Sequence, residues 1–335
     1  MKTRFSCHLT GRDWWKPFLV FFAVLVFLNL QMQDASSKIT LATKGRELTS
    51  IILYYFVIYA LFILVQAASL IILSSRALPK IVLGDTCSSF HGKMLPYLGI
   101  NIKGFLLTLI TLGLYYPWYS RSLLAYYYSS VTIQDAPLIF SGTAKKLFKY
   151  FIFGLLLPLL VWSVAFGITF GMAILSYTTT GEIDTSHVFL TILLFFSLFP
   201  LLAPFLYLSL RWSLSVQWKS RTLVINITFW DGLFFFIKQI FLACITLAIY
   251  LPAVYINTYR FFASQSTLAE EGQEPIIIGF DGTNREGFGF IWKQILLSLI
   301  TCGIYFPWAY AKILCFFING TWLDEKSADT TALEA

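Results

Sequence analysis

Three apolar stretches of this chain repeat one pattern, and this repeat limits the possible folds more than any other feature of the sequence. They occupy residues 102–118, 237–253 and 292–308. The first and third copies align without a gap over residues 90–133 and 280–323, with 14 identities in 44 positions. Because a repeat defines the structural unit of a fold, we expect these two copies to be structurally equivalent.

The shared positions form a motif that begins with Phe-x-Gly and ends with Pro-Trp. The middle copy keeps Lys238 but has Ala248 and Ala253 where the other copies have Gly and Trp, so it is degenerate. The motif residues of the first copy are Phe90, Gly92, Thr111, Gly113, Tyr115, Pro117 and Trp118. Those of the third copy are Phe280, Gly282, Thr301, Gly303, Tyr305, Pro307 and Trp308.

The composition indicates an integral membrane protein. Hydrophobic residues make up 58% of the 335 residues and charged residues only 12%, about half the charge content of an ordinary soluble domain. A spanning helix needs roughly 20 apolar residues. We therefore predict an all-α polytopic membrane protein with six or seven transmembrane helices, internal repeats and small extramembrane β elements. The predicted spans are 51–75, 104–119, 149–177, 188–210, 233–256 and 290–309, with 14–32 as the seventh.

The repeats and spans divide the chain into six segments. We predict an N-terminal transmembrane region (1–84), repeat copy one (85–148), a central helical hairpin (149–221), degenerate copy two (222–274), copy three (275–323) and a disordered tail (324–335). The basic residues that precede segment 14–32 fit both a cleaved secretory signal and a retained first helix. We favour a retained helix, because no clear small-x-small cleavage site follows.

Loop charge predicts an orientation in the membrane. Loops 120–146 and 212–232 are basic and read as cytoplasmic, whereas 178–187 and 257–287 are acidic and read as external. This places the C-terminus on the cytoplasmic side of a bacterial inner membrane. Seven crossings would then place the N-terminus outside despite its basic residues, so either one N-terminal segment does not span or one repeat copy is re-entrant. The loop charge also makes the middle copy run opposite to the other two, as in the inverted repeats of transporters. Duplication of a stable hairpin without a transported substrate is the equal alternative.

Short segments beside the repeat helices read as strands. Residues 131–142, 222–232 and 275–282 are rich in β-branched and aromatic residues and contain turn formers. We expect the glycine that ends each of them to permit a sharp entry into the next helix.

The motif residues resemble those of the YjgN-like bacterial inner-membrane family, a domain of unknown function. The resemblance rests on the two Phe-x-Gly motifs with their Pro-Trp endings and on Phe140-Ser141-Gly142-Thr143, and it covers roughly residues 85–323. Relatives tend to carry a basic cluster after Pro-Trp, whereas here only Arg121 and Lys312 follow. The resemblance implies fold and location, and it supplies no catalytic residues.

The lysines, aromatic residues, prolines and glycines of these segments each have a separate interpretation. Lys103, Lys238 and Lys293 are predicted to be interfacial anchors that extend to the headgroups, or else lysines that line a cavity for an anionic group. The Tyr and Trp residues fit an aromatic belt at the opposite interface, and the prolines end or bend the helix. We expect Gly113 and Gly303 to permit close helix contact. Gly167 and Gly171 form a GxxxG motif for helix packing, within the monomer or in a dimer.

Catalytic chemistry is nearly absent from the sequence. No nucleophile, phosphate-binding or metal-binding motif occurs, so we predict no enzyme, no metal and no cofactor. The five cysteines are scattered, and Cys244, Cys302 and Cys315 read as apolar fillers. The net charge of +7 suits loops that face anionic lipid and requires no nucleic acid. Expected partners are membrane lipids and other envelope proteins.

Two classes of function stay open. One is transport or lipid handling through a cavity between the repeat helices. The other is a non-catalytic scaffold or regulatory partner of envelope proteins. No Asp or Glu falls inside a predicted span, which disfavours a conventional ion-coupled carrier.

Overall fold

The computed structural model describes residues 2–41, 45–181, 185–270 and 272–324, so most of the predicted tail lies outside the described residues. The helices are α1 (Trp15–Leu41), α2 (Gly45–Ala77), α3 (Met94–Ile110), α4 (Tyr116–Ser129), α5 (Ala144–Phe151), α6 (Leu157–Thr180), α7 (Thr185–Ser213), α8 (Phe229–Ile245), α9 (Leu251–Ser264), α10 (Asn284–Ile300) and α11 (Phe306–Asn319). The strands are β1 (Lys2–Cys7), β2 (Ile81–Leu83), β3 (Thr86–Cys87), β4 (Ser89–Phe90), β5 (Val131–Ile133), β6 (Ala136–Phe140), β7 (Val216–Trp218), β8 (Arg221–Ile225), β9 (Ser266–Ala269), β10 (Ile276–Phe280) and β11 (Thr321–Asp324).

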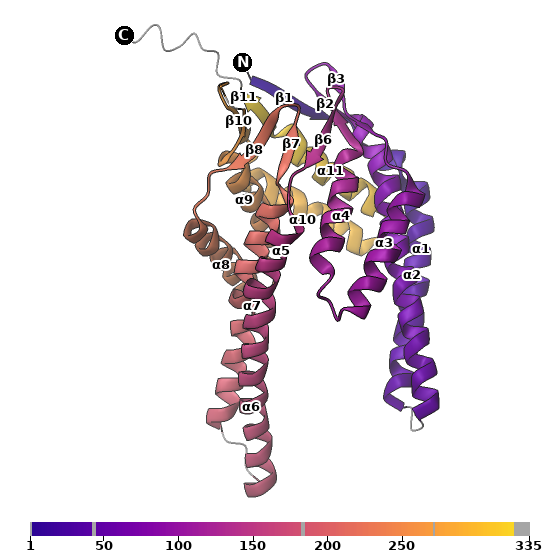
Figure 1. Ribbon diagram of the computed structural model, residues 1–335, viewed down its shortest axis with the longest axis vertical. Coiled ribbons are helices and arrows are strands. Elements are labelled where there is room, and N and C mark those ends of the chain that lie inside the picture. The colour runs from indigo at the N-terminus through magenta and orange to yellow at the C-terminus, as the bar shows by residue number, and fades with distance from the viewer. Residues whose placement is uncertain (1, 42–44, 182–184, 271, 325–335) are drawn as a thin grey trace.

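The described residues form five units, and each unit is a helical hairpin held between two paired strands. The five strand pairs are β1 with β2, β4 with β5, β6 with β7, β8 with β9, and β10 with β11, all antiparallel. In Figure 1 the strands gather at one end of the molecule and the helical hairpins extend from them in one general direction. The repeat therefore has five copies, of which only three are detected in the sequence.

The strands of the five units join into one sheet that nearly closes on itself. Its order is β3-β2-β1-β11-β10-β9-β8-β7-β6-β5-β4, and only Ser88 separates the two end strands in the chain. Leu83, Trp218, Leu268 and Leu323 belong to a buried apolar cluster contributed by strands around the ring. The small β elements expected from the sequence thus form a continuous, packed sheet rather than isolated pieces.

Three of the predicted spans are hairpins rather than straight helices. Segments 104–119, 233–256 and 290–309 each contain a five-residue turn, at 111–115, 246–250 and 301–305. The arms of each hairpin have 17 and 14 residues, and both return to the sheet. The helices long and apolar enough to cross a membrane are α1, α2, the continuous helical segment Ala144–Thr179, and α7. The six or seven spans expected from the sequence are therefore four such helices among the described residues.

Local hydrogen bonds explain why the repeat turns at this point. The Thr111 hydroxyl donates to the Leu107 carbonyl at 2.7 Å and accepts the Tyr115 amide at 3.0 Å, while the Gly113 amide bonds the Thr108 carbonyl at 2.7 Å. Gly113 has a φ of +92°, a left-handed conformation that L side chains rarely adopt. A Cβ there would meet nothing within 4 Å, so the expected close helix contact is wrong and the backbone conformation is the reason for glycine.

The third copy repeats this turn, and the degenerate copy keeps it without the glycine. Thr301 makes the equivalent bonds to Leu297 and Tyr305, and Gly303 has a φ of +87°. A Cβ on Gly303 would lie 3.0 Å from the Phe22 ring on α1, so the expected close helix contact is present at this copy. Ala248 takes the glycine position with a φ of +68°. An alanine held in this region is strained, because its Cβ approaches the following carbonyl oxygen.

This difference yields a paired prediction. Ala248→Gly should raise the thermal unfolding temperature of the detergent-purified protein, because glycine relieves strain of roughly 1 kcal/mol. Gly113→Ala, the matched change in copy one, should lower it by a similar free energy. If both variants shift the melting temperature in the same direction, the left-handed turn is not the source of the effect.

Two loops that we predicted on opposite sides of the membrane are in contact. The Arg221 guanidinium lies 3.5 Å from the Glu270 carboxylate, and Thr222 pairs with Ala269 across β8 and β9. Loop 257–287 therefore cannot be external if loop 212–232 is cytoplasmic. The inverted orientation of the middle copy is also wrong, because each copy leaves the sheet and returns to it. The charge argument failed because it counted each folded hairpin as one crossing.

The Phe-x-Gly motif is a packing device. A Cβ on Gly92, Gly142 or Gly282 would lie 2.2 to 2.4 Å from the ring of the phenylalanine two residues earlier, so the ring covers the glycine. No left-handed φ is recorded at these glycines, so the expected role in a sharp turn is not the reason for them. The other two units have Ile225-x-Ile227 and Cys7-x-Leu9, with a smaller first residue and a larger third.

Neighbouring units are joined at the third residue of this motif. Arg121 donates to the Gly142 carbonyl at 3.3 Å, Arg260 donates to the Gly282 carbonyl, and Arg211 donates to the Ile227 carbonyl at 3.0 Å. Each arginine lies on the second helix of the preceding hairpin. Charged donors bind carbonyl oxygens more strongly than neutral donors do, so these contacts fix the position of each hairpin against the next.

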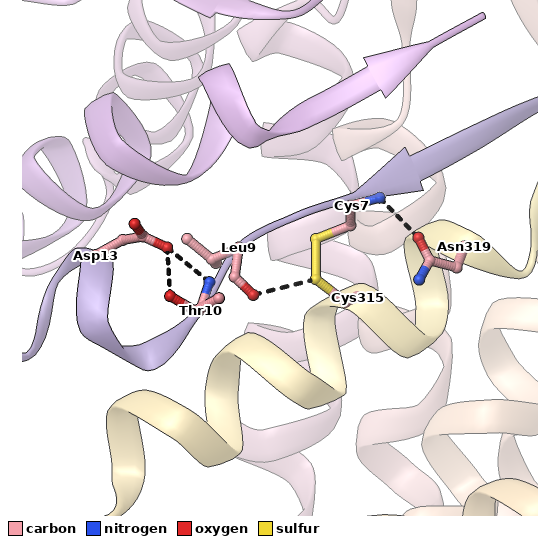
Figure 2. The surroundings of a disulfide bond; sticks show 6 residues. All are labelled: Cys7, Leu9, Thr10, Asp13, Cys315 and Asn319. Carbon is pink, nitrogen blue, oxygen red and sulfur yellow. Dashed lines mark hydrogen bonds between the residues drawn. A yellow bond between two sulfur atoms is a disulfide. The ribbon is translucent and has the colours of Figure 1, made fainter.

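A disulfide takes the place of the arginine where the last unit meets the first. Cys315 on α11 is bonded to Cys7 on β1, with Cα atoms 5.1 Å apart (Figure 2). The Cys315 sulfur also lies 3.7 Å from the Leu9 carbonyl, and the Asn319 side chain accepts the Cys7 amide at 2.7 Å. The reading of Cys315 as an apolar filler is therefore wrong, because the fold brings together two cysteines 308 residues apart.

Breaking this bond should destabilise the ring. We expect Cys315→Ala to lower stability by roughly 2–5 kcal/mol, because the crosslink closes a very long loop of the unfolded chain. The measurement is thermal unfolding of oxidised protein, with Cys87→Ala as the control because Cys87 is free and exposed. An equal melting temperature for Cys315→Ala and the parent would contradict a structural role.

Candidate functional site

The helical hairpins line an open cavity. Its volume is about 950 Å³, and α2, α3, α4, α5, α7, α8 and α9 all contribute to its wall. Four of the five units therefore meet at this cavity. A volume of this size lies near the upper end of the range for small-molecule sites.

The cavity wall is apolar apart from hydroxyl groups. It contains no Asp, Glu, Lys, Arg, His or Cys among the described residues. Leu123, Leu210 and Phe236 typify the apolar part, and the hydroxyl-bearing residues are Tyr97, Tyr116, Ser120, Tyr127, Tyr128, Ser209, Ser213, Tyr255 and Thr258. Such a wall favours apolar ligands and offers no ionised group to an ion.

Several of these hydroxyls already have partners. The Tyr127 hydroxyl lies 2.9 Å from the Ser74 hydroxyl, and the Tyr128 hydroxyl donates to the Ser213 carbonyl at 3.1 Å. Burial raises the pKa of Tyr128, with a further contribution from the neighbouring Tyr127. Tyr128 therefore stays a neutral phenol at physiological pH. The serine and threonine hydroxyls of the wall have no His, Asp, Glu, Lys or Cys beside them among the described lining residues.

The three repeat lysines lie outside this cavity. Lys103, Lys238 and Lys293 are exposed on the first helix of their hairpins, and none of them lines the cavity. The residue after each one is buried. The structure thus places these side chains on the outer surface of the hairpins, where an interfacial anchor would lie.

Buried polar contacts join the two arms of a hairpin, and sequence reasoning missed them. The Tyr119 hydroxyl donates to Asn101 at 2.8 Å in copy one, and the Tyr305 hydroxyl donates to Gln294 at 3.0 Å in copy three. Lys312 lies 2.9 Å from the same Tyr305 hydroxyl. Pairing Asn and Gln with a tyrosine eleven to eighteen residues later would have been a usable signal, once a hairpin was assumed.

The repeat aromatics and the GxxxG glycines lie away from the cavity. The rings of Tyr115 and Trp118 stack at 6.1 Å in the first turn of α4, and those of Tyr305 and Trp308 stack at the same distance. Gly167 and Gly171 are exposed on α6, where an added Cβ would meet no described atom within 4 Å.

The fold places this chain in a class of proteins in which helical hairpins extend from a single sheet. Some of these helices are long and apolar enough to cross a membrane. A family model described as bacterial protein of unknown function (DUF898) matches residues 85–274, more than half of the chain. The protein belongs to this family, which is the YjgN-like family, so the resemblance seen in its motifs is confirmed. No curated protein and no solved structure matches the chain.

Proposed function

We propose that this protein is a non-catalytic, multi-pass protein of the bacterial inner membrane that holds the hydrocarbon part of a membrane lipid between its helical hairpins. One observation supports the proposal above all: the 950 Å³ cavity has an apolar wall with hydroxyls and no charged residue among the described residues. Ligand sites of this kind bind through apolar area, while a few polar groups set orientation.

The placement in the membrane follows from helix length and charge. Helices α1, α2 and α7 and the segment Ala144–Thr179 would cross, and an even number of crossings leaves the sheet, with β1 and β11, on one side. Among the described lysines and arginines, only Lys38 and Arg46 lie near the far ends of these helices. Because basic loops stay in the cytoplasm, we infer that the sheet is cytoplasmic.

The short hairpins would then enter only part of the bilayer. Lys103, Lys238 and Lys293 each precede the exposed hairpin tip by about nine residues, or about 13 Å of helix. Leu112 and Leu247 at the tips are 93% and 87% exposed. Lysines at headgroup level and leucines at the end of an apolar arm fit a hairpin that reaches roughly the middle of the bilayer.

The apolar interior of the sheet argues against a pore that conducts ions, and so favours the lipid-binding proposal. Its apolar cluster, which includes Leu83 and Trp218, fills the space that strands around the ring enclose. A pore for ions would need polar or charged groups along its lining. The alternative of a scaffold for envelope proteins would gain support if the cavity proved to be empty of lipid.

Filling the cavity should displace its ligand. We expect Leu210→Trp to reduce the amount of lipid that copurifies with the protein severalfold, as measured by mass spectrometry of extracts after detergent washing. The control is Leu193→Trp, a matched change on the same helix at an exposed position outside the cavity. Equal lipid retention in both variants, with both folded, would contradict the proposal.

The orientation has its own test. In a background without native cysteines, Lys219→Cys and Gln273→Cys should both resist an impermeant thiol reagent added to intact spheroplasts, because both lie on the sheet side. Thr179→Cys, at the far end of α6, should react. Labelling of the first two positions and protection of the third would reverse the orientation.

The disulfide provides a second test of the same orientation. Cysteine pairs in the cytoplasm are normally kept reduced. A cytoplasmic sheet therefore predicts free thiols at Cys7 and Cys315 in acid-quenched growing cells, with the bond closing after oxidation. A bond already present in those cells would place the sheet on the outer side.

A further inference from the structure

A second, smaller pocket lies on the third hairpin and is lined by basic residues. Its volume is about 200 Å³, between the start of α5, the end of α7 and strand β8. Lys146, Tyr150, Arg211 and Ser215 supply its polar side chains, and no Asp or Glu lines it. It shares only Trp212 with the central cavity.

The positive charge of this pocket has no carboxylate partner among the described residues. Arg211 is half-buried, and its recorded hydrogen bonds go to neutral oxygens: the Ile225 carbonyl at 3.1 Å, the Ile227 carbonyl at 3.0 Å and the Tyr207 hydroxyl at 3.3 Å. These bonds leave part of its donor fork unused. Lys146 is exposed and makes no hydrogen bond or ion pair with another described residue, so only Arg211 is partly desolvated. A partly desolvated cation without a counter-charge favours binding of an anion.

The position of the pocket indicates where that anion comes from. Helix α5 begins the membrane-length segment Ala144–Thr179, and α7 ends at Ser213, so both helices meet the sheet at this level. Lys145 and Lys149 add two exposed charges on the same short helix. Basic pockets between membrane helices near the cytoplasmic face bind phosphate-bearing lipid headgroups.

We propose that the pocket formed by Lys146, Tyr150 and Arg211 binds the phosphate of an anionic phospholipid headgroup. Lys146 supplies an exposed ammonium group, and Arg211 supplies a guanidinium held by the carbonyls of Ile225 and Ile227. The Tyr150 hydroxyl, which has no recorded partner, supplies a neutral donor. This inference rests on the membrane placement proposed above, but the site is distinct from the central cavity and does not require that the cavity holds lipid.

Lys146→Gln tests the site, with Lys145→Gln as the matched control. Both changes remove one charge from neighbouring positions of the same helix, but only Lys146 lines the pocket. We expect Lys146→Gln to weaken binding of short-chain phosphatidylglycerol about fivefold, measured by native mass spectrometry in a neutral detergent, because one lysine contributes about 1 kcal/mol at an anionic surface. Lys145→Gln should leave the affinity nearly unchanged.

Further arms of the experiment separate the sources of the anion. Phosphatidylcholine, which has no net charge, should not distinguish the two variants. Tyr150→Phe keeps the ring and should weaken phosphatidylglycerol binding to a smaller extent. Equal losses for Lys145→Gln and Lys146→Gln would show diffuse attraction and overturn the site. If inorganic phosphate binding depends on Lys146 while phosphatidylglycerol binding does not, the headgroup assignment is wrong.

The outcome is independent of the central cavity. Leu210→Trp should leave the preference for phosphatidylglycerol over phosphatidylcholine intact, because Leu210 does not line the basic pocket. Loss of headgroup preference would therefore concern only this site, and loss of total copurified lipid would concern only the cavity.

Discussion

Antiparallel pairing of the first strand with the last is the interaction on which the rest of this structure depends. Strand β1 pairs with β11 through Lys2, Thr3 and Arg4, and it pairs with β2 through Phe5, Ser6 and Cys7. Without these bonds the sheet would expose two long unpaired edges, which proteins avoid. With them, every hairpin has a neighbour on both sides, and the helices surround a common space.

The same backbone position joins neighbouring units at three places around this ring. There the third residue of the motif presents its carbonyl to the preceding hairpin and accepts a hydrogen bond from Arg121, Arg211 or Arg260. At the junction that involves both chain ends, Cys315 occupies the position, counted from the helix proline, that Arg260 has in its own hairpin. In the oxidised protein, the bond from Cys315 to Cys7 links the last unit covalently to the first.

Closure of the ring also separates an apolar surface from a basic one. The central cavity has an apolar wall with neutral hydroxyls, whereas the repeat lysines and the pocket around Lys146 lie outside it. The uncharged wall of the cavity suits the acyl chains of a phospholipid, and the basic pocket at the sheet end suits its headgroup. The proposed functions of the two sites agree with this division, although each depends on its own residues.

The sequence by itself determined the features that depend on neighbours within a few residues. The repeat, the apolar helices, the strand character beside Phe140 and Phe280, and the family follow from local composition and spacing. Thr111 and Gly113 even encode the turn, although we read the glycine as a contact point because the turn was taken for part of a straight helix.

Only the tertiary structure decided how these local pieces combine. The fivefold count stayed hidden because the first unit has Cys7-x-Leu9 in place of Phe-x-Gly, and because the unit that begins with Phe140 has long helices where the recognised copies have the short hairpin. The contact between Arg221 and Glu270 and the pairing of Cys7 with Cys315 join residues 49 and 308 positions apart. The first contact arises because one hairpin folds back so that β8 and β9 pair, and the second arises from ring closure, a property of all five units together. No local pattern in the sequence can specify either of them.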